Sequence, residues 1–117
     1  MNEHEKINYV ELPAQNLVAA STFFSEVFGW QFEDYGPEYC AFSGGGLNGG
    51  FYLANVNSTT LNGAALIVFY SEDLAATQAK IVNAGGIVVK PVFSFPGGRR
   101  FHFTDPNHNE FAVWSDK

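Results

Sequence analysis

Apolar residues recur every three or four positions in two segments of the chain, and this spacing predicts two amphipathic helices. The first spans residues 17–28, with Asn16 as a favourable N-cap and Gly29 as the residue after the helix. The second spans residues 74–82 and follows Asp73, another good N-cap, while a pair of glycines closes it. Each helix should bury one apolar face against a sheet.

Shorter apolar runs, bounded by Gly, Pro, Asn and Asp, predict β-strands before and after each helix. One run precedes each helix, at 7–12 and at 65–70. Three runs follow each helix: 30–35, 38–43 and 50–56 in the first half, and 87–93, 99–104 and 110–115 in the second.

The two halves therefore repeat the same order of elements. An offset of 57 residues separates the two caps, Asn16 and Asp73, and it also brings the strand before each helix into alignment. Each half reads strand, helix, strand, strand, strand, with a polar linker at 57–63. We expect one α+β domain over residues 1–117, built of two βαβββ modules at about 5–56 and 64–117, with two small sheets that pack together.

Composition and charge narrow the choice of partners. The 117 residues are 46% hydrophobic and include twelve Phe, which is typical of a globular domain. Twelve acidic against six basic residues give a net charge of −6, which argues against nucleic acid and anionic membranes as partners. The chain has no long apolar run and no recognisable signal peptide, and its one cysteine, Cys40, allows no internal disulfide. We expect a cytoplasmic protein and an inert, buried thiol.

Three stretches resemble the vicinal oxygen chelate superfamily, which includes glyoxalase I, extradiol dioxygenases and the bleomycin and fosfomycin resistance proteins. They are an I-x-x-V-x-L strand leading to AQNLVAASTFFSEVFGW, then SEDLAATQAKIVNAGG, and then FTDPNHNEFAVW. The last is similar to the family's D-P-x-G-N hairpin, with His108 in place of the usual Gly. The resemblance implies a curved mixed sheet with a cupped pocket for a ligand, in a chain that pairs as a homodimer. It implies fold more strongly than activity, because this fold serves many chemistries.

The resemblance also implies where a metal would be held, on the first, fourth, fifth and eighth strands. Counting from the helix caps and from the hairpin gives Tyr9, Leu66 and Ala112 for three of these positions. The fourth falls among Phe51, Tyr52 and Leu53. None of these is a usual ligand for a divalent metal, so we expect no metal and no other cofactor.

Two other motifs have simpler interpretations. Asp105, Asn107 and Asn109 copy the first half of a calcium loop, but Glu110 stands where that loop needs Gly, and a strand follows. Asp-Pro-Asn is ordinary turn chemistry, so the turn is expected to be structural. The glycines of 44–49 match a dinucleotide-binding pattern, but they precede a strand instead of a helix and read as a hairpin region.

Alternation along the strands predicts which side chains face the pocket. Val10 and Leu12 should contact the first helix, which leaves their neighbours in the cup. The expected pocket residues are Tyr9, Glu11, Leu66, Tyr70, Arg100, His102, Glu110, Ala112 and Trp114. An apolar cup with a few charged groups suits a small organic ligand.

Within this set we assign roles by chemistry. Arg100 would hold a carboxylate or phosphate, and Glu11 and His102 would transfer protons if a substrate is bound. Alternatively, Glu11 and Arg100 pair with each other. Glu110 can also be read as a solvated strand end, and the aromatic Tyr9 and Trp114 as part of a dimer interface.

These observations leave three classes of function open. The first is a metal-free protein that binds a small hydrophobic or aromatic molecule. The second is an enzyme of the glyoxalase, isomerase or dioxygenase type, with metal ligands at displaced positions or with metal-free acid–base chemistry. The third is a regulatory domain or subunit whose cup binds a partner protein. The absence of ligands at the counted metal positions favours the first.

Overall fold

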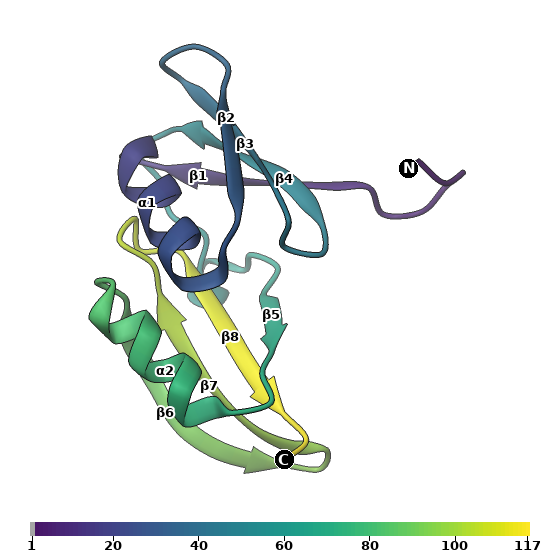
Figure 1. Ribbon diagram of the computed structural model, residues 1–117, viewed down its shortest axis with the longest axis vertical. Coiled ribbons are helices and arrows are strands. Elements are labelled where there is room, and N and C mark those ends of the chain that lie inside the picture. The colour runs from purple at the N-terminus through teal and green to yellow at the C-terminus, as the bar shows by residue number, and fades with distance from the viewer. Residues whose placement is uncertain (1) are drawn as a thin grey trace.

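The computed structural model describes residues 2–117, and its elements follow the predicted order (Figure 1). The first module consists of β1 (Tyr9–Ala14), α1 (Leu17–Phe28), β2 (Gln31–Asp34), β3 (Tyr39–Ser43) and β4 (Asn48–Leu53). The second consists of β5 (Ile67–Tyr70), α2 (Leu74–Asn83), β6 (Ile87–Phe95), β7 (Gly98–Thr104) and β8 (Glu110–Ser115). A short 3₁₀ turn, η1 (Thr60–Asn62), lies in the linker.

Each module forms its own four-stranded mixed sheet. Sheet A has the strand order β1-β4-β3-β2, and sheet B has the order β5-β8-β7-β6. The pairs β1–β4 and β5–β8 are parallel, and the remaining pairs are antiparallel. Glu11 lies opposite Gly50 in sheet A, and Val68 lies opposite Ala112 in sheet B. The internal repeat found in the sequence is therefore a repeat of structure, in register.

The helix ends match the caps read from the sequence. The side chain of Asn16 accepts a hydrogen bond from the N–H of Ala19, and Asp73 accepts one from Ala76. Gly29 closes α1 with φ 71°, a left-handed conformation that favours glycine. Among residues 2–117, no helix has the length and apolar character needed to cross a bilayer.

Helix α1 packs against both sheets through its phenylalanines. The ring of Phe24 lies 5.6 Å from that of Phe51 on β4 and 5.3 Å from that of Phe111 on β8, between ring centroids. Phe28 stacks on Phe69 of β5 at 4.2 Å. Figure 1 shows α1 between the two sheets. Because both sheets turn their buried side toward this helix, their opposite sides point away from the common core.

The polar turn before β8 connects the two modules through hydrogen bonds. The Asn107 Oδ1 accepts from the backbone N–H groups of Gln15, at 3.0 Å, and Asn16, at 2.8 Å. Its Nδ2 donates to the carbonyl of Asn16 at 3.1 Å. Asn107 is 2% exposed, so these bonds form away from water. The second module thereby holds the junction between β1 and α1.

Asn109 makes the second half of this connection. Its Nδ2 donates to the carbonyl of Pro13 at 2.7 Å, and its Oδ1 accepts from the N–H of Ser58 in the linker at 2.8 Å. The Asp105 carboxylate accepts from the N–H groups of Asn107 and Asn109, both at 2.9 Å, and so shapes the turn. We call Asp105, Asn107 and Asn109 the inter-module clamp.

The clamp confirms the structural interpretation of this turn. Its side-chain oxygens accept from backbone N–H groups, apart from Asp105 Oδ2, which accepts from the Asn109 side chain, so they are engaged in holding the turn. His108 adopts φ 66°, the left-handed conformation that a Gly at this place would adopt easily, and its side chain is exposed. Histidine is tolerated here at some cost in backbone strain.

We predict that Asn109→Ala lowers the free energy of unfolding by about 2–4 kcal/mol, because it leaves the Pro13 carbonyl and the Ser58 N–H without partners. Chemical denaturation at neutral pH measures this. The exposed Asn83→Ala at the end of α2 is the control, and it should change stability by less than about 0.5 kcal/mol. Equal effects of the two substitutions would contradict the assigned role.

The clamp also predicts a pH dependence of stability. Burial raises the pKa of Asp105 from 3.8 to about 6, against the opposing effect of its hydrogen bonds from Asn109 and Asn107. The folded chain then binds more protons than the unfolded chain between these two values. The contribution of protonated Asp105 to the free energy of unfolding is thus complete below about pH 4. It is lost as the pH rises through about 6.

Asp105→Asn removes this titration and keeps an acceptor oxygen in place. From pH 4 to pH 7 the wild type should therefore lose about 3 kcal/mol of stability relative to the variant. Denaturation of both proteins across this range tests it, because other titrating groups cancel in the difference. A difference that does not change with pH would contradict the assignment.

Candidate functional site

We call the side of each sheet that points away from α1 and α2 its outer face. The strand alternation is as predicted: Leu12 is buried and Val10 packs against the core, while Tyr9 and Glu11 are exposed on the outer face of sheet A. The remaining predicted site residues belong to sheet B or its edge. They are Leu66, Tyr70, Arg100, His102, Glu110, Ala112 and Trp114.

On sheet A, Tyr9 and Glu11 are joined through a residue that the sequence analysis missed, Tyr39 of β3. The Tyr39 hydroxyl donates to Glu11 Oε2 at 2.9 Å, and it lies 2.5 Å from the Tyr9 hydroxyl. A carboxylate only accepts, so Tyr9 is left to donate to Tyr39. Burial, followed by the hydrogen bonds with Tyr9 and Glu11, raises the pKa of Tyr39. Tyr39 therefore stays protonated at neutral pH.

The ring of Tyr39 lies directly over Gly50 of β4. A Cβ added at Gly50 would collide with the Tyr39 hydroxyl and ring carbons. Gly49 is equally confined, by the Val10 carbonyl and the Phe42 ring. Both glycines belong to β4, whereas the sequence analysis placed Gly49 in the preceding hairpin region and began the strand at Gly50. Close approach of neighbouring groups explains why β4 contains two glycines.

The strand register locates the fourth position at which the resemblance implies a metal ligand. Gly50 pairs with Glu11 as Ala112 pairs with Val68, so Gly50 is the counterpart of Ala112. The sequence analysis placed this position among residues 51–53. Phe51 is fully buried in the core and cannot face a pocket. The fourth implied ligand position is therefore occupied by Gly50, which has no side chain to offer a metal.

On sheet B, His102 and Glu110 form a buried pair. His102 Nδ1 lies 2.8 Å from Glu110 Oε2, and the side chains are 5% and 13% exposed. The N–H and the hydroxyl of Thr60 both donate to Glu110 Oε1 at 2.9 Å. Glu110 is thus not a solvated strand end. Burial alone would raise the pKa of Glu110, but the hydrogen bonds from His102 and Thr60 outweigh it and lower the pKa.

Because the Glu110 carboxylate can only accept, the proton between the two residues lies on His102 Nδ1. The other ring nitrogen, Nε2, is buried and has no hydrogen-bond partner. Thr60 was not predicted to belong to this site. Nothing in the linker sequence indicates it, since the contact depends on how the linker packs on β8.

Arg100 is half-buried and lies among aromatic rings on the same face. Its guanidinium is 5.5 Å from the ring centroid of Phe93 and 5.8 Å from that of Phe95. Its Nε is buried without a hydrogen-bond partner. The ion pairs formed among residues 2–117 are His4–Glu5 and His102–Glu110, so the alternative pairing of Arg100 with Glu11 is not formed.

Ala112 differs from expectation. It lies on the outer face between His102 and Val68 but has no exposed surface, because the longer neighbouring side chains cover it. Trp114 is half-buried beside Tyr70, with ring centroids 5.1 Å apart. The aromatic surface predicted for the pocket is present, but Ala112 is closed to a ligand in this chain.

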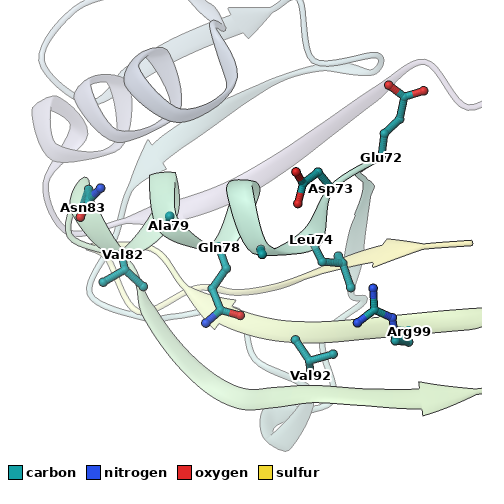
Figure 2. Close-up of a pocket in the computed structure, with 10 residues that line it drawn as sticks. Glu72, Asp73, Leu74, Gln78, Ala79, Val82, Asn83, Val92 and Arg99 are labelled. Atoms are coloured by element: carbon teal, nitrogen blue, oxygen red, sulfur yellow. The ribbon is translucent and has the colours of Figure 1, made fainter. Parts of the chain in front are cut away.

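The best-formed surface concavities among residues 2–117 do not bring the two groups of predicted residues together. One lies beside Glu11, one beside Tyr9 and one beside Tyr70, and none of these is lined by residues of both groups. A groove of about 600 Å³, which no sequence pattern predicted, lies between α2 and strands β6 and β7. Figure 2 shows Gln78, Val92 and Arg99 around it.

The residues present do not fit a metal ion. Within the described part of the chain, no three His, Cys, Asp or Glu side chains converge on one point. The positions at which the resemblance implies ligands hold Tyr9, Gly50, Leu66 and Ala112. Only Tyr9 offers a polar side-chain atom, and its hydroxyl is bonded to Tyr39.

Comparison with known families decides the relationship that the motifs suggested. The model of the Glyoxalase/Bleomycin resistance protein/Dioxygenase superfamily matches residues 6–113. The chain belongs to this superfamily. The paired βαβββ modules with mixed four-stranded sheets are its glyoxalase-like fold. A search of curated proteins found no match for the chain.

Solved structures of superfamily members have the same fold at low sequence identity. A glyoxalase/bleomycin resistance protein/dioxygenase family enzyme from Burkholderia phytofirmans PsJN is 18% identical with a TM-score of 0.79, covering 96% of this chain and 99% of its own. The fosfomycin resistance protein FosX from Listeria monocytogenes is 18% identical with a TM-score of 0.78, over 97% and 94%. Lactoylglutathione lyase from Agrobacterium tumefaciens is 20% identical with a TM-score of 0.70, over 97% and 95%.

We predict that Gly50→Ala destabilises the protein by about 1–3 kcal/mol, because the new methyl group collides with Tyr39. In a Tyr39→Ala background the same substitution should be neutral or stabilising, since alanine loses less conformational entropy than glycine in a strand. Denaturation of the four proteins in this cycle measures the coupling. Equal penalties in both backgrounds would show that Tyr39 is not the obstacle.

Proposed function

We propose that the protein binds a small organic molecule without a metal, on the outer faces of its sheets. The outer face of sheet B supports this proposal most directly. There the rings of Phe93, Phe95 and Trp114 surround two buried polar atoms that have no partner, Arg100 Nε and His102 Nε2. Aromatic surface with few, specifically placed polar groups is typical of small-molecule sites. We expect this function in the cytoplasm.

We further propose that the pocket forms between two copies of the chain. The outer faces of sheets A and B point away from the common core, so one chain does not enclose a cup between them. Each face carries partly exposed apolar side chains, including Tyr9 and Tyr52 on sheet A and Val68 and Tyr70 on sheet B. A homodimer in which sheet A of one copy lies over sheet B of the other would cover these residues and enclose a cavity.

One observation favours a catalytic variant of this function. Glu110 fixes the proton of His102 on Nδ1, which leaves Nε2 as a proton acceptor on the ligand-facing side. This arrangement would allow metal-free removal of a proton from a bound substrate, as in an isomerase or a lyase of the glyoxalase type. Glu11 is the weaker candidate for this role, because it already accepts a hydrogen bond from Tyr39.

The dimer is tested by placing a charge on the outer face of sheet B. Val68→Glu would bury an uncompensated carboxylate in the interface and should weaken dimerisation by about tenfold or more, measured by sedimentation equilibrium. Val18→Glu, on the exposed side of α1, is the matched control and should leave the dimer intact. A wild-type protein that is monomeric at all accessible concentrations would contradict the proposal.

Ligand binding is tested with a panel of small planar aromatic compounds, neutral and charged, by thermal shift. We expect members of the panel to raise the melting temperature of the wild type, because they bind only the folded state. Chelator treatment should leave this shift unchanged. A shift that requires an added divalent metal would overturn the metal-free function, and no shift with any compound would count against binding of this ligand class.

A further inference from the structure

Arg100 is a half-buried cation that the fold leaves without a counter-charge. The chain has twelve acidic and six basic residues, yet its ion pairs among residues 2–117 do not include Arg100. Lys90 lies 5.2 Å from the Phe93 ring centroid, on which Arg100 also rests. Two of the six bases are thus gathered around one aromatic ring. A partly desolvated cation without an anion costs free energy, and an anionic ligand would recover it.

His102 supplies a second polar group on the same face. It follows Arg100 by two positions on β7, so the two side chains project in the same direction about 7 Å apart along the strand. In the tautomer that donates through Nδ1 to Glu110, the imidazole presents a lone pair at Nε2. That atom is buried without a partner. It suits a ligand group that donates a hydrogen bond, such as a hydroxyl.

We propose that Arg100 and His102 together recognise an aromatic carboxylic acid that carries a hydroxyl group. The carboxylate binds the guanidinium of Arg100, and the hydroxyl donates to Nε2 of His102. The aromatic body of the ligand packs among Phe93, Phe95 and Trp114. This inference rests on the proposed function and specifies the chemical class of its ligand.

The Phe93 ring lies beside His102, with 5.9 Å between its centroid and that of the imidazole. The pairing of β6 with β7 shifts register on both sides of Lys90, between Val88 and Lys90 and again between Lys90 and Phe93. The irregular segment therefore ends at Phe93, and the pairing with β7 is regular from Phe93 to Phe95. In this proposal the Phe93 side chain shifts to admit the ligand hydroxyl to the buried Nε2 and stays in contact with the aromatic body of the ligand.

The probe is para-hydroxybenzoate, titrated calorimetrically into the full chain, with para-hydroxybenzamide and benzoate as comparison ligands. The amide removes the charge that Arg100 recognises, and benzoate removes the hydroxyl. We expect para-hydroxybenzoate to bind more tightly than either. Arg100→Gln should weaken its binding by about 10- to 100-fold, the usual loss for a hydrogen bond to a charged group.

Arg99→Gln is the matched control, because it makes the same change of charge at the adjacent residue. Arg99 lines the groove beside α2 on the opposite side of the sheet, so its substitution should leave affinity unchanged. Arg100→Lys keeps the charge but loses the planar fork, and it should lose part of the affinity. This variant provides the test if Arg100→Gln does not fold, as judged by circular dichroism.

Three results would overturn the inference in distinguishable ways. Equal binding of the amide and the acid would exclude the carboxylate clamp and leave the small-molecule function standing. Equal losses in Arg99→Gln and Arg100→Gln would show a general charge effect in place of a site. If wild type binds neither the acid nor any neutral aromatic compound, the inference fails together with the proposed function.

Discussion

The amide side chains of Asn107 and Asn109 set the relation between the two modules, and the rest of the structure depends on that relation. The sheets are separate, so no strand pairing fixes one module on the other. Asn107 instead bonds the backbone at the start of α1, and Asn109 bonds the end of β1. Helix α1 is thereby placed so that Phe24 reaches both cores. Buried, fully bonded polar groups give this contact a single geometry, which apolar packing alone would specify less strictly.

The features of the fold that could be predicted are those that depend on residues close together in the sequence. Helix caps, strand alternation and the repeat each depend on nearby residues, and these predictions are confirmed. The contacts that the sequence did not predict join residues far apart in the chain. Tyr39 reaches Glu11, Thr60 reaches Glu110, and Gly50 is small because of the ring above it. Such contacts follow from packing between strands, which periodicity does not encode.

The same limit applies to the candidate site. Alternation placed the predicted side chains on the correct faces, but it carried no information about how deeply a neighbour would cover them, so Ala112 was expected to be open. The charge of Arg100 is evident from the sequence, but the groups that surround its guanidinium are not. Its significance comes from the aromatic rings beneath it and from the lack of an acidic partner, because Glu110 on the same face is already bonded to His102 and Thr60. The outer face of sheet B thus brings Lys90 and Arg100 to one aromatic ring on a chain of net charge −6.

The contact between Tyr39 and Gly50 constrains how this chain can change over generations. A side chain that could coordinate a metal from position 50 of β4 collides with the tyrosine ring that occupies the space above it. Tyr39 would have to become smaller first, and that change alone breaks the hydrogen bonds to Tyr9 and Glu11. A chain with a smaller residue at position 39 and glycine still at position 50 has lost these hydrogen bonds and has not gained a metal ligand. The residues at positions 39 and 50 are therefore coupled, and a metal-ligating side chain on β4 requires a change on β3 as well.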